Sequence, residues 1–321
     1  MLVHPKLDKL SFTIKKKDML CNNLKRLLNY LEVREDVNFN NSPCYVTVHI
    51  TPTKLIRPNL TYDDTMKHNL QMNTDLIVKF FEELKQFYIY AHNLNILNLH
   101  IAKDRVMENT PQDYYLPLVD DQTRFKGRVR AFMVNNGTTP SVHICNDSDS
   151  MNRGEKLIKN YDKSKQLQDH LKVQEITPLE PLAKDEIKML GKGYSKYTGR
   201  INLEKVNLMR SEIELKGNGL LLLPHTGSRL RAIDILTMIK EDTLYDNLDK
   251  TYKSVIEKAL FPQKKEATKD SALDRFIVAD SIHRFDSLFM AFGKYQAYKE
   301  YTNSIITKDD KLLEEMYDKF M

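Results

Sequence analysis

The chain has 321 residues, of which 41% are hydrophobic and 29% are charged. This composition is typical of a folded globular protein and excludes a disordered one, and the length allows one large domain or two modest domains. The net charge of +5, from 49 Lys and Arg against 44 Asp and Glu, permits nucleic-acid binding but excludes a histone-like basic protein.

Three scattered cysteines, Cys21, Cys44 and Cys145, exclude a disulfide framework and a zinc knuckle, and they indicate reduced thiols. The N-terminal segment lacks the apolar core of a signal peptide, and no apolar run approaches the ~18 residues of a membrane span. We therefore expect a cytoplasmic protein that has no membrane partner.

Hydrophobic periodicity predicts both strands and helices in the first hundred residues. Strands are expected at residues 10–14, 44–51 and 95–102, and helices at 17–31 and 65–90. In the second strand the apolar residues fall on one face and the polar residues on the other, as in a half-buried strand.

The central part of the chain is expected to continue the sheet. Asn135-Asn136-Gly137 is a turn signal that predicts a hairpin. Residues 108–126 are loop-like, and 166–193 form a polar insertion whose second half has helical spacing. Further strands are expected at residues 128–134, 141–144, 156–161 and 208–216.

Only helical patterns follow residue 231. They fall at residues 233–239, 244–260, 272–279, 285–301 and 309–320. The expected fold is therefore α+β, with a mainly antiparallel central sheet followed by a C-terminal helical region. We predict two domains, residues 1–223 and residues 224–321.

Tyr161 ends a predicted strand within a lysine cluster, Glu155-Lys-Leu-Ile-Lys-Asn-Tyr-Asp-Lys-Ser-Lys165. A phenol is a poor nucleophile at neutral pH because its pKa is near ~10, but cations and a metal-bound phosphate beside it would favour the phenolate. Lys163 would share its face if the strand continues that far. A tyrosine placed in this way can take a DNA phosphate onto itself and hand it back to a hydroxyl. The alternative is that Tyr161 is an ordinary, half-buried strand residue.

His49 and His100 each lie on the polar side of a predicted strand. Glu212 alternates in the same way on the last predicted strand, together with Arg210 and Glu214. If these strands pair, two imidazoles and one carboxylate would suit a divalent cation, Mg²⁺ or Mn²⁺, with positions left open for phosphate oxygens. Such a metal would polarise a phosphodiester. The alternative is that both histidines are hydrogen-bonded strand residues.

Four further basic residues are candidates to contact a DNA backbone. Lys159 and Lys165 belong to the lysine cluster around Tyr161. Arg210 and Lys216 lie on the strand of Glu212, either as salt-bridge partners within the sheet or as contacts to a DNA phosphate.

Several common enzyme motifs do not occur in the sequence. It has no Gly-x4-Gly-Lys-Ser/Thr loop, Gly-x-Ser-x-Gly elbow, Gly-x-Gly-x-x-Gly turn or His-Glu-x-x-His pair. A nucleotide hydrolase, an α/β-hydrolase and a zinc protease are therefore not expected.

Four ordered segments span roughly the first two-thirds of the chain. They are Leu7-Asp-Lys-Leu-Ser-Phe-Thr-Ile14; Tyr45-Val-Thr-Val-His-Ile-Thr-Pro-Thr-Lys-Leu55 with the later Ile96-Leu-Asn-Leu-His-Ile101; Leu157-Ile-Lys-Asn-Tyr-Asp-Lys-Ser-Lys-Gln-Leu167; and Leu208-Met-Arg-Ser-Glu-Ile-Glu-Leu-Lys216. In order and spacing the segments resemble the replication initiators of filamentous phages, the gene II endonucleases, and related rolling-circle plasmid initiators.

The resemblance implies an enzyme that nicks one DNA strand at an origin, becomes linked to the 5′ phosphate through a tyrosine, and later rejoins the strand. It implies Tyr161 as the nucleophile, Lys163 as its companion lysine and Glu212 as a metal ligand. His49 and His100 stand where the phage proteins carry other residues, so the metal set stays open. The implied partner is origin DNA, single- and double-stranded, and a host helicase, a polymerase and a second copy of the chain are further candidates.

Two other hypotheses stay open. The first is a non-catalytic, sequence-specific DNA-binding regulator of plasmid or phage replication, in which the C-terminal helices would read the duplex. The second is a mobilisation relaxase or transposase with the same chemistry. A metal-dependent strand cut with a covalent adduct separates an enzyme from a regulator, and action at a transfer origin or at element ends would favour the last hypothesis.

Overall fold

The computed structural model describes most of the chain up to residue 259. The predicted helices at 272–279, 285–301 and 309–320, and the first part of the helix predicted at 65–90, lie outside the described residues. Described are residues 5–34, 37–54, 74–120, 129–136, 139–146, 156–171, 174–178 and 182–259.

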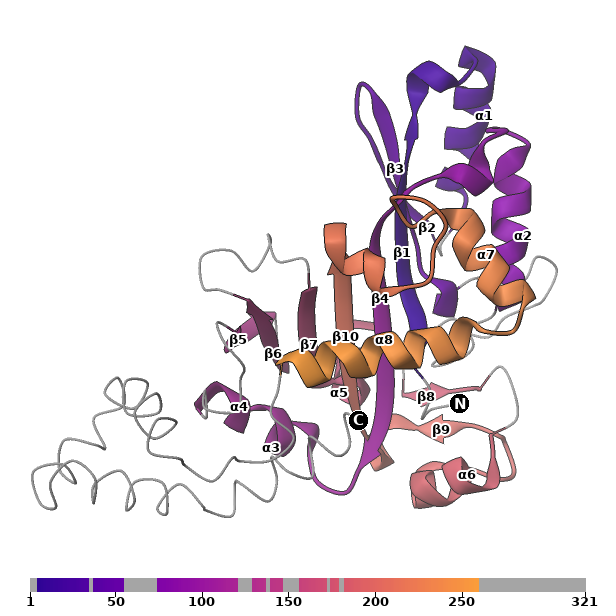
Figure 1. Ribbon diagram of the computed structural model, residues 1–321. Helices are drawn as coiled ribbons and strands as arrows, with labels where there is room; N and C mark the ends of the chain where they lie inside the picture. The colour runs from indigo at the N-terminus through magenta and orange to yellow at the C-terminus, as the bar shows by residue number, and fades with distance from the viewer. Residues whose placement is uncertain are drawn as a thin grey trace, which may run out of the picture.

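An eight-stranded sheet with the order β2-β3-β1-β4-β10-β7-β6-β5 forms the centre of the molecule (Figure 1). Every neighbouring pair of strands in it is antiparallel, so the predicted α+β class with a mainly antiparallel sheet is confirmed. The strands are β1 (Lys6–Lys15), β2 (Val37–Asn41), β3 (Tyr45–Ile50), β4 (Ile96–Met107), β5 (Val129–Asn136), β6 (Thr139–Asn146), β7 (Lys156–Asp162) and β10 (Asn207–Lys216).

Among the helices that share the main hydrophobic core with the sheet are α1 (Cys21–Glu32), α2 (Thr74–Lys85), α7 (Ala232–Lys240) and α8 (Leu244–Ala259). The first three gather at one end of the sheet, and α8 runs across it (Figure 1). Phe12 of β1 packs against Phe80 and Phe81 of α2, and Tyr252 of α8 lies under the Lys103 ammonium of β4. These helices therefore cover one face of the sheet.

The alternation of residues along β10 decides what each face of the sheet presents. Met209, Ile213 and Leu215 belong to the main core. Because side chains alternate along a strand, Arg210 and Glu212 point to the opposite face. The polar residues of the predicted site are therefore on the face away from that core.

A second, smaller core covers part of this polar face. It is built by α5 (Lys163–Leu171), α6 (Lys184–Leu190) and the two-stranded sheet of β8 (Glu175–Ile176) and β9 (Ile201–Asn202). Leu208 of β10 belongs to it, and Leu208 shares its face with Arg210 two residues on. The polar site therefore lies next to this cover, at the start of α5.

The predicted domain boundary at residue 223 falls between β10 and α7. Both α7 and α8 contribute side chains to the same core as the sheet, so these two helices pack with the first 223 residues. For the residues beyond 259 the division into two domains stays a prediction.

Three short elements differ from the predicted pattern. β2 consists of Val-Asn-Phe-Asn-Asn, a composition that disfavours a strand, and it forms by pairing with the edge of β3. The predicted loop at 108–126 contains α3 (Pro111–Tyr115) and α4 (Pro117–Asp120), where burial of Tyr114 and Tyr115 outweighs the weak local signal.

Within the described residues no helix is long and apolar enough to cross a membrane.

Candidate active site

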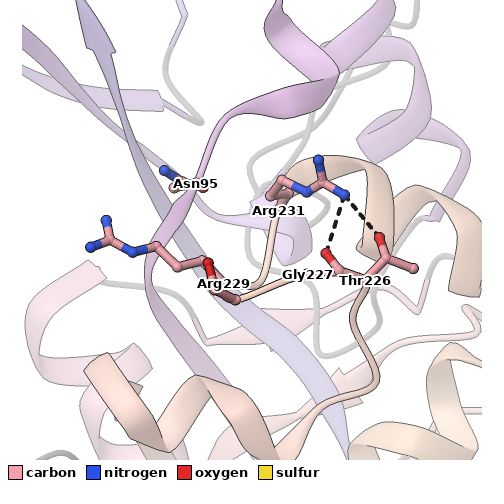
Figure 2. A pocket seen from close by; sticks show the side chains of 6 residues that line it. Asn95, Thr226, Gly227, Arg229 and Arg231 are labelled. Atoms are coloured by element: carbon pink, nitrogen blue, oxygen red, sulfur yellow. Dashed lines mark hydrogen bonds between the residues drawn. The ribbon is translucent and has the colours of Figure 1, made fainter.

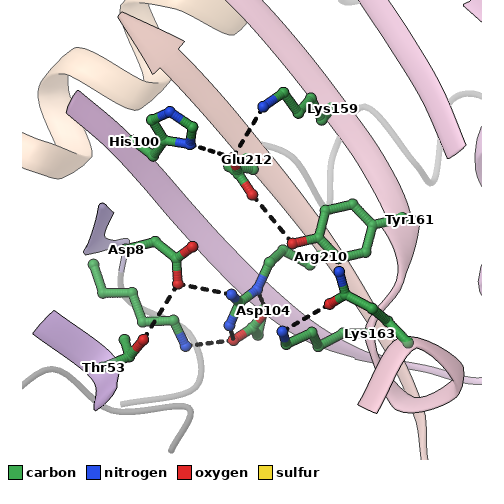
Figure 3. A network of polar contacts seen from close by, with 11 residues as sticks. Asp8, Thr53, His100, Asp104, Lys159, Tyr161, Lys163, Arg210 and Glu212 are labelled. Carbon is green, nitrogen blue, oxygen red and sulfur yellow. Dashed lines mark hydrogen bonds and ion pairs between the residues drawn. The ribbon is translucent and has the colours of Figure 1, made fainter. Parts of the chain in front are cut away.

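The side chains of Tyr161, Glu212 and His100 meet on the polar face of the sheet (Figure 3). The Tyr161 hydroxyl donates a hydrogen bond to Glu212 Oε2 at 3.1 Å, and Glu212 Oε1 lies 2.5 Å from His100 Nδ1. The three residues come from β7, β10 and β4, which are neighbours in the sheet. The antiparallel register sets Arg210 opposite Tyr161 and Glu212 opposite Ala102. Glu212 is therefore two residues along β10 from the partner of Tyr161, and its own partner is two residues along β4 from His100, so the three side chains lie on one face within reach of each other.

The Tyr161–Glu212 pair consists of a neutral phenol and a carboxylate. Burial, together with the negative charge of Glu212, raises the pKa of Tyr161 well above 10. Burial opposes ionisation of Glu212 as well, but the hydrogen bond from His100 and the charge of Lys159 lower the pKa of that carboxyl below its usual range. Glu212 is therefore a carboxylate that accepts the hydrogen bond of the neutral phenol.

Lys159 lies between two glutamates of β10. Its ammonium contacts Glu214 at 2.8 Å and Glu212 at 3.4 Å, and Lys216 contacts Glu214 at 2.5 Å. Burial works against ionisation, but these partners lower the pKa of Glu214 to about 2. Lys159 and Lys216 are thus ion-paired within the sheet, and their contact with DNA stays a prediction. Lys165 is exposed on α5.

Arg210 lies in a buried charge cluster beneath the site (Figure 3). It donates to Asp104 at 2.6 and 2.7 Å and to Asp8 at 2.8 Å, and the Lys6 ammonium also contacts Asp104. Arg210, Asp104 and Lys6 are only 2%, 0% and 3% exposed. Burial opposes ionisation of Asp104, but the two cations hold its pKa well below the usual range. Arg210 therefore forms the salt bridges that were one of its two predicted roles, and its contact with DNA stays a prediction.

Lys163 is the first residue of α5 rather than a continuation of β7. Its ammonium donates to Gln166 at 2.8 Å, and Figure 3 places it on the same side of the sheet as Tyr161. Burial and the positive charge of Arg210 lower the pKa of Lys163 to about 7, although Asp8 and Asp104 oppose this shift. An amine with this pKa can donate or accept a proton near neutral pH.

His49 lies close to this group of residues without joining it. Its Nδ1 lies 2.7 Å from the Ser11 hydroxyl of β1, the strand that separates β3 from β4. Burial lowers the pKa of His49, as do the charges of Lys9 and His100. His100 is therefore near enough to lower the pKa of His49.

The residues of the site offer two donors that fit a divalent cation. His100 is 6% exposed, and its Nε2 is buried without a hydrogen-bond partner among the described residues. Glu214 Oε1 lies 3.7 Å from this nitrogen, and the same oxygen accepts a hydrogen bond from Asn98 at 3.0 Å and pairs with Lys216. In the part of the chain that the structure describes, no group of three or more His, Cys, Asp or Glu side chains is arranged to hold a metal ion. Mg²⁺ and Mn²⁺ bound to phosphates commonly use few protein ligands and several waters.

Sequence reasoning missed Asp8, Asp104 and Lys6. Asp104 continues the alternation of β4 by four residues from His100 on the same face, but the predicted strand ended at residue 102. The charged run Lys103-Asp104-Arg105 is typical of a strand end, which hid the continuation. Continuing the alternation of β4 by two more residues beyond Ala102 would have identified Asp104.

No known protein family and no curated protein sequence matches the chain. Among solved structures, the chain is similar to a rolling circle replication initiator protein from Geobacillus stearothermophilus. The two share 13% sequence identity with a TM-score of 0.40, over 84% of this chain and 90% of that chain.

Proposed function

We propose that the protein is a rolling-circle replication initiator, a DNA-nicking enzyme that forms a 5′-phosphotyrosine link through Tyr161. The observation that carries this proposal is the hydrogen bond from the Tyr161 hydroxyl to Glu212. A half-buried phenol that donates a hydrogen bond to a carboxylate, with an amine of lowered pKa nearby, has the parts needed for attack on a phosphodiester.

The proposed cleavage step moves two protons, one from the attacking tyrosine and one to the leaving 3′ oxygen. As the Tyr161 oxygen bonds to phosphorus, its proton passes to Glu212 Oε2. The bond from phosphorus to the 3′ oxygen breaks, and the Lys163 ammonium donates a proton to that oxygen, which leaves a 3′ hydroxyl. Rejoining runs the same path backwards, so neutral Lys163 then takes the proton from the 3′ hydroxyl.

The pKa of Lys163 predicts a pH dependence with opposite signs for the two directions. Cleavage needs the ammonium, so kcat/KM for cleavage is expected to fall as the pH rises through about 7. Rejoining needs the neutral amine and is expected to rise over the same range. The groups that face Lys163 and set this pKa are Arg210, Asp8, Asp104 and Lys6.

Rates measured from pH 6 to 9 with separate cleavage and rejoining substrates test this prediction. Lys163→Arg stays protonated throughout, so it should keep cleavage above pH 7 and lose rejoining. Parallel pH profiles for the two directions would contradict the role of Lys163.

A divalent cation, Mg²⁺ or Mn²⁺, belongs to the proposal. His100 Nε2 and the Glu214 carboxylate would hold it, with His49 as a third candidate. Glu212, predicted as a ligand, contacts the other ring nitrogen of His100, an arrangement in which a carboxylate orients a metal-bound histidine. When bound, the metal would neutralise charge on the phosphate.

We expect Glu214→Gln and His100→Ala each to weaken Mn²⁺ binding by at least about tenfold, because each removes a donor. Calorimetry and Mn²⁺ electron paramagnetic resonance on the DNA-free protein measure this without relying on activity. Glu204→Gln, at an exposed position, is the matched control. Unchanged binding in both variants would place the metal elsewhere.

The function itself is tested with a supercoiled plasmid that carries the chain's neighbouring intergenic region, incubated with Mg²⁺, Mn²⁺ or chelator. We expect a metal-dependent nick and a protein–DNA adduct that survives denaturing electrophoresis. Binding without any nick would instead favour the non-catalytic regulator. Cutting confined to a transfer origin or to element ends would favour a relaxase or transposase.

A further inference from the structure

A pocket far along β4 from the site is lined by basic and hydroxyl side chains. It has a volume of about 650 Å³ and is formed by Asn95, Thr226, Gly227, Ser228, Arg229 and Arg231 (Figure 2). Asn95 precedes β4, five residues before His100, a separation of ~16 Å along an extended strand. No acidic residue is among those that line the pocket.

The loop that carries the two arginines is fixed to the sheet. Ile96 donates its backbone N–H to Leu230 at 2.9 Å, and Ala232 donates to Leu94 at 2.9 Å. Between these bonds Leu230 is buried in the main core. Gly227 has φ +97, a left-handed conformation that side chains disfavour. Arg229 therefore projects from a rigid frame.

The carboxylate of Asp234 occupies the N-terminus of α7, the helix that follows the loop. Asp234 accepts hydrogen bonds from the backbone of Thr226 at 3.0 Å and of Arg231 at 2.8 Å. Arg231 in turn donates to the Thr226 hydroxyl at 2.8 Å. The N-terminus of α7 is thus satisfied internally, so a ligand would have to be drawn by the side chains that line the pocket.

Three of these side chains are exposed donors without a hydrogen-bond or ion-pair partner among the described residues: the Arg229 guanidinium, the Ser228 hydroxyl and the Asn95 amide. Guanidinium, hydroxyl and amide groups together are donors for phosphate oxygens. In Figure 2 the side chains of Arg229 and Arg231 point away from each other. They are therefore suited to separate phosphates of one strand rather than to a single phosphate.

We infer that this pocket, the Arg229 pocket, binds the phosphate backbone of DNA outside the cleavage site. The inference rests on the proposed function, because an enzyme that cuts at an origin must hold DNA beyond the scissile phosphate. Arg229 contributes the positive charge of the contact, and Arg231 holds the loop through its hydrogen bond to Thr226. Free phosphate and nucleotides share this chemistry and are separated from DNA by the experiment.

The test compares full-length wild type with Arg229→Ala, Arg229→Lys and Lys85→Ala by fluorescence anisotropy on labelled duplex and single-stranded origin DNA over a salt series. Loss of one phosphate contact should reduce the slope of log K against log salt by about 0.9 on duplex or about 0.7 on a single strand, and weaken binding several-fold. Arg229→Lys should keep most of the slope. Lys85→Ala, which removes one surface charge on α2, should leave it unchanged.

An unchanged slope in Arg229→Ala on both DNAs would overturn the inference. The same holds if only the thermal stabilisation by inorganic phosphate depends on Arg229. Adduct formation on a short oligonucleotide that spans only the cleavage site is measured in parallel. If wild type forms no adduct while the Arg229 effect on the slope remains, the proposed function fails and the backbone contact stands.

Discussion

Replacing Tyr161 with phenylalanine is expected to abolish the covalent protein–DNA adduct and to lower the cleavage rate at least about 10⁴-fold, as losses of an essential nucleophile do. The change removes only the hydroxyl that donates to Glu212. Loss of that hydrogen bond should alter the free energy of unfolding by about 1 kcal/mol, so the variant should fold. Denaturing gels with labelled DNA measure the adduct, and anisotropy measures origin binding, which should persist.

Tyr197→Phe is the matched control, because Tyr197 is 99% exposed and belongs to the segment after α6. It should retain the full yield of adduct. Adduct formation by the Tyr161 variant would contradict the proposal and direct attention to Tyr194 and Tyr197. Loss of both adduct and DNA binding would indicate that Tyr161 supports the fold instead of the chemistry.

Strand periodicity was enough to predict much of the site. The alternation of β10 puts Arg210 and Glu212 on one face, and the alternation of β4 puts His100 on the polar side. Because β4 and β10 are neighbours in the sheet, the polar faces predicted for the two strands coincide, and His100 contacts Glu212. Antiparallel pairing of β10 with β7 then brought in Tyr161.

The remaining parts of the site depend on contacts that no local pattern encodes. Arg210 meets Asp104 and Asp8 across 106 and 202 residues of sequence. Likewise, Lys159 forms salt bridges because the neighbouring strand β10 places two carboxylates beside it, and the local sequence around Lys159 does not show this. Lys163 was predicted on the face of Tyr161 by strand alternation, but it begins a helix and still lies on that side. The partners of these side chains are determined by tertiary packing and not by the alternation of residues along one strand.

Asp104→Ala is expected to have the largest effect on stability, a loss of about 3–5 kcal/mol in the free energy of unfolding. Among the described residues it leaves the buried guanidinium of Arg210 with Asp8 as its one carboxylate partner. Lys6 can respond by losing its proton, because burial already lowers its pKa, but an arginine cannot. Urea unfolding followed by circular dichroism measures the change. Asp185→Ala, at an exposed position on α6, should cost less than about 1 kcal/mol.

The pH dependence of stability gives an independent check on Asp104. Its pKa in the folded protein is lower than in the unfolded chain, so the unfolded state binds the proton first as the pH falls. The contribution of Asp104 is therefore complete above about pH 5 and is lost as the pH falls towards its folded pKa. The wild type should lose stability in this acid range more steeply than Asp104→Ala.

A double-mutant cycle separates a buried ion pair from two independent packing positions. Breaking a buried pair leaves an uncompensated charge, whereas replacing both partners by apolar residues is often neutral or stabilising. Arg210→Met combined with Asp104→Leu should therefore be more stable than either single variant, with a coupling of a few kcal/mol. Additive losses would contradict the cluster as a coupled unit. If the double variant folds but no longer cleaves DNA, Arg210 also positions Lys163 or Tyr161 for the reaction, because its charge acts on the pKa of both groups.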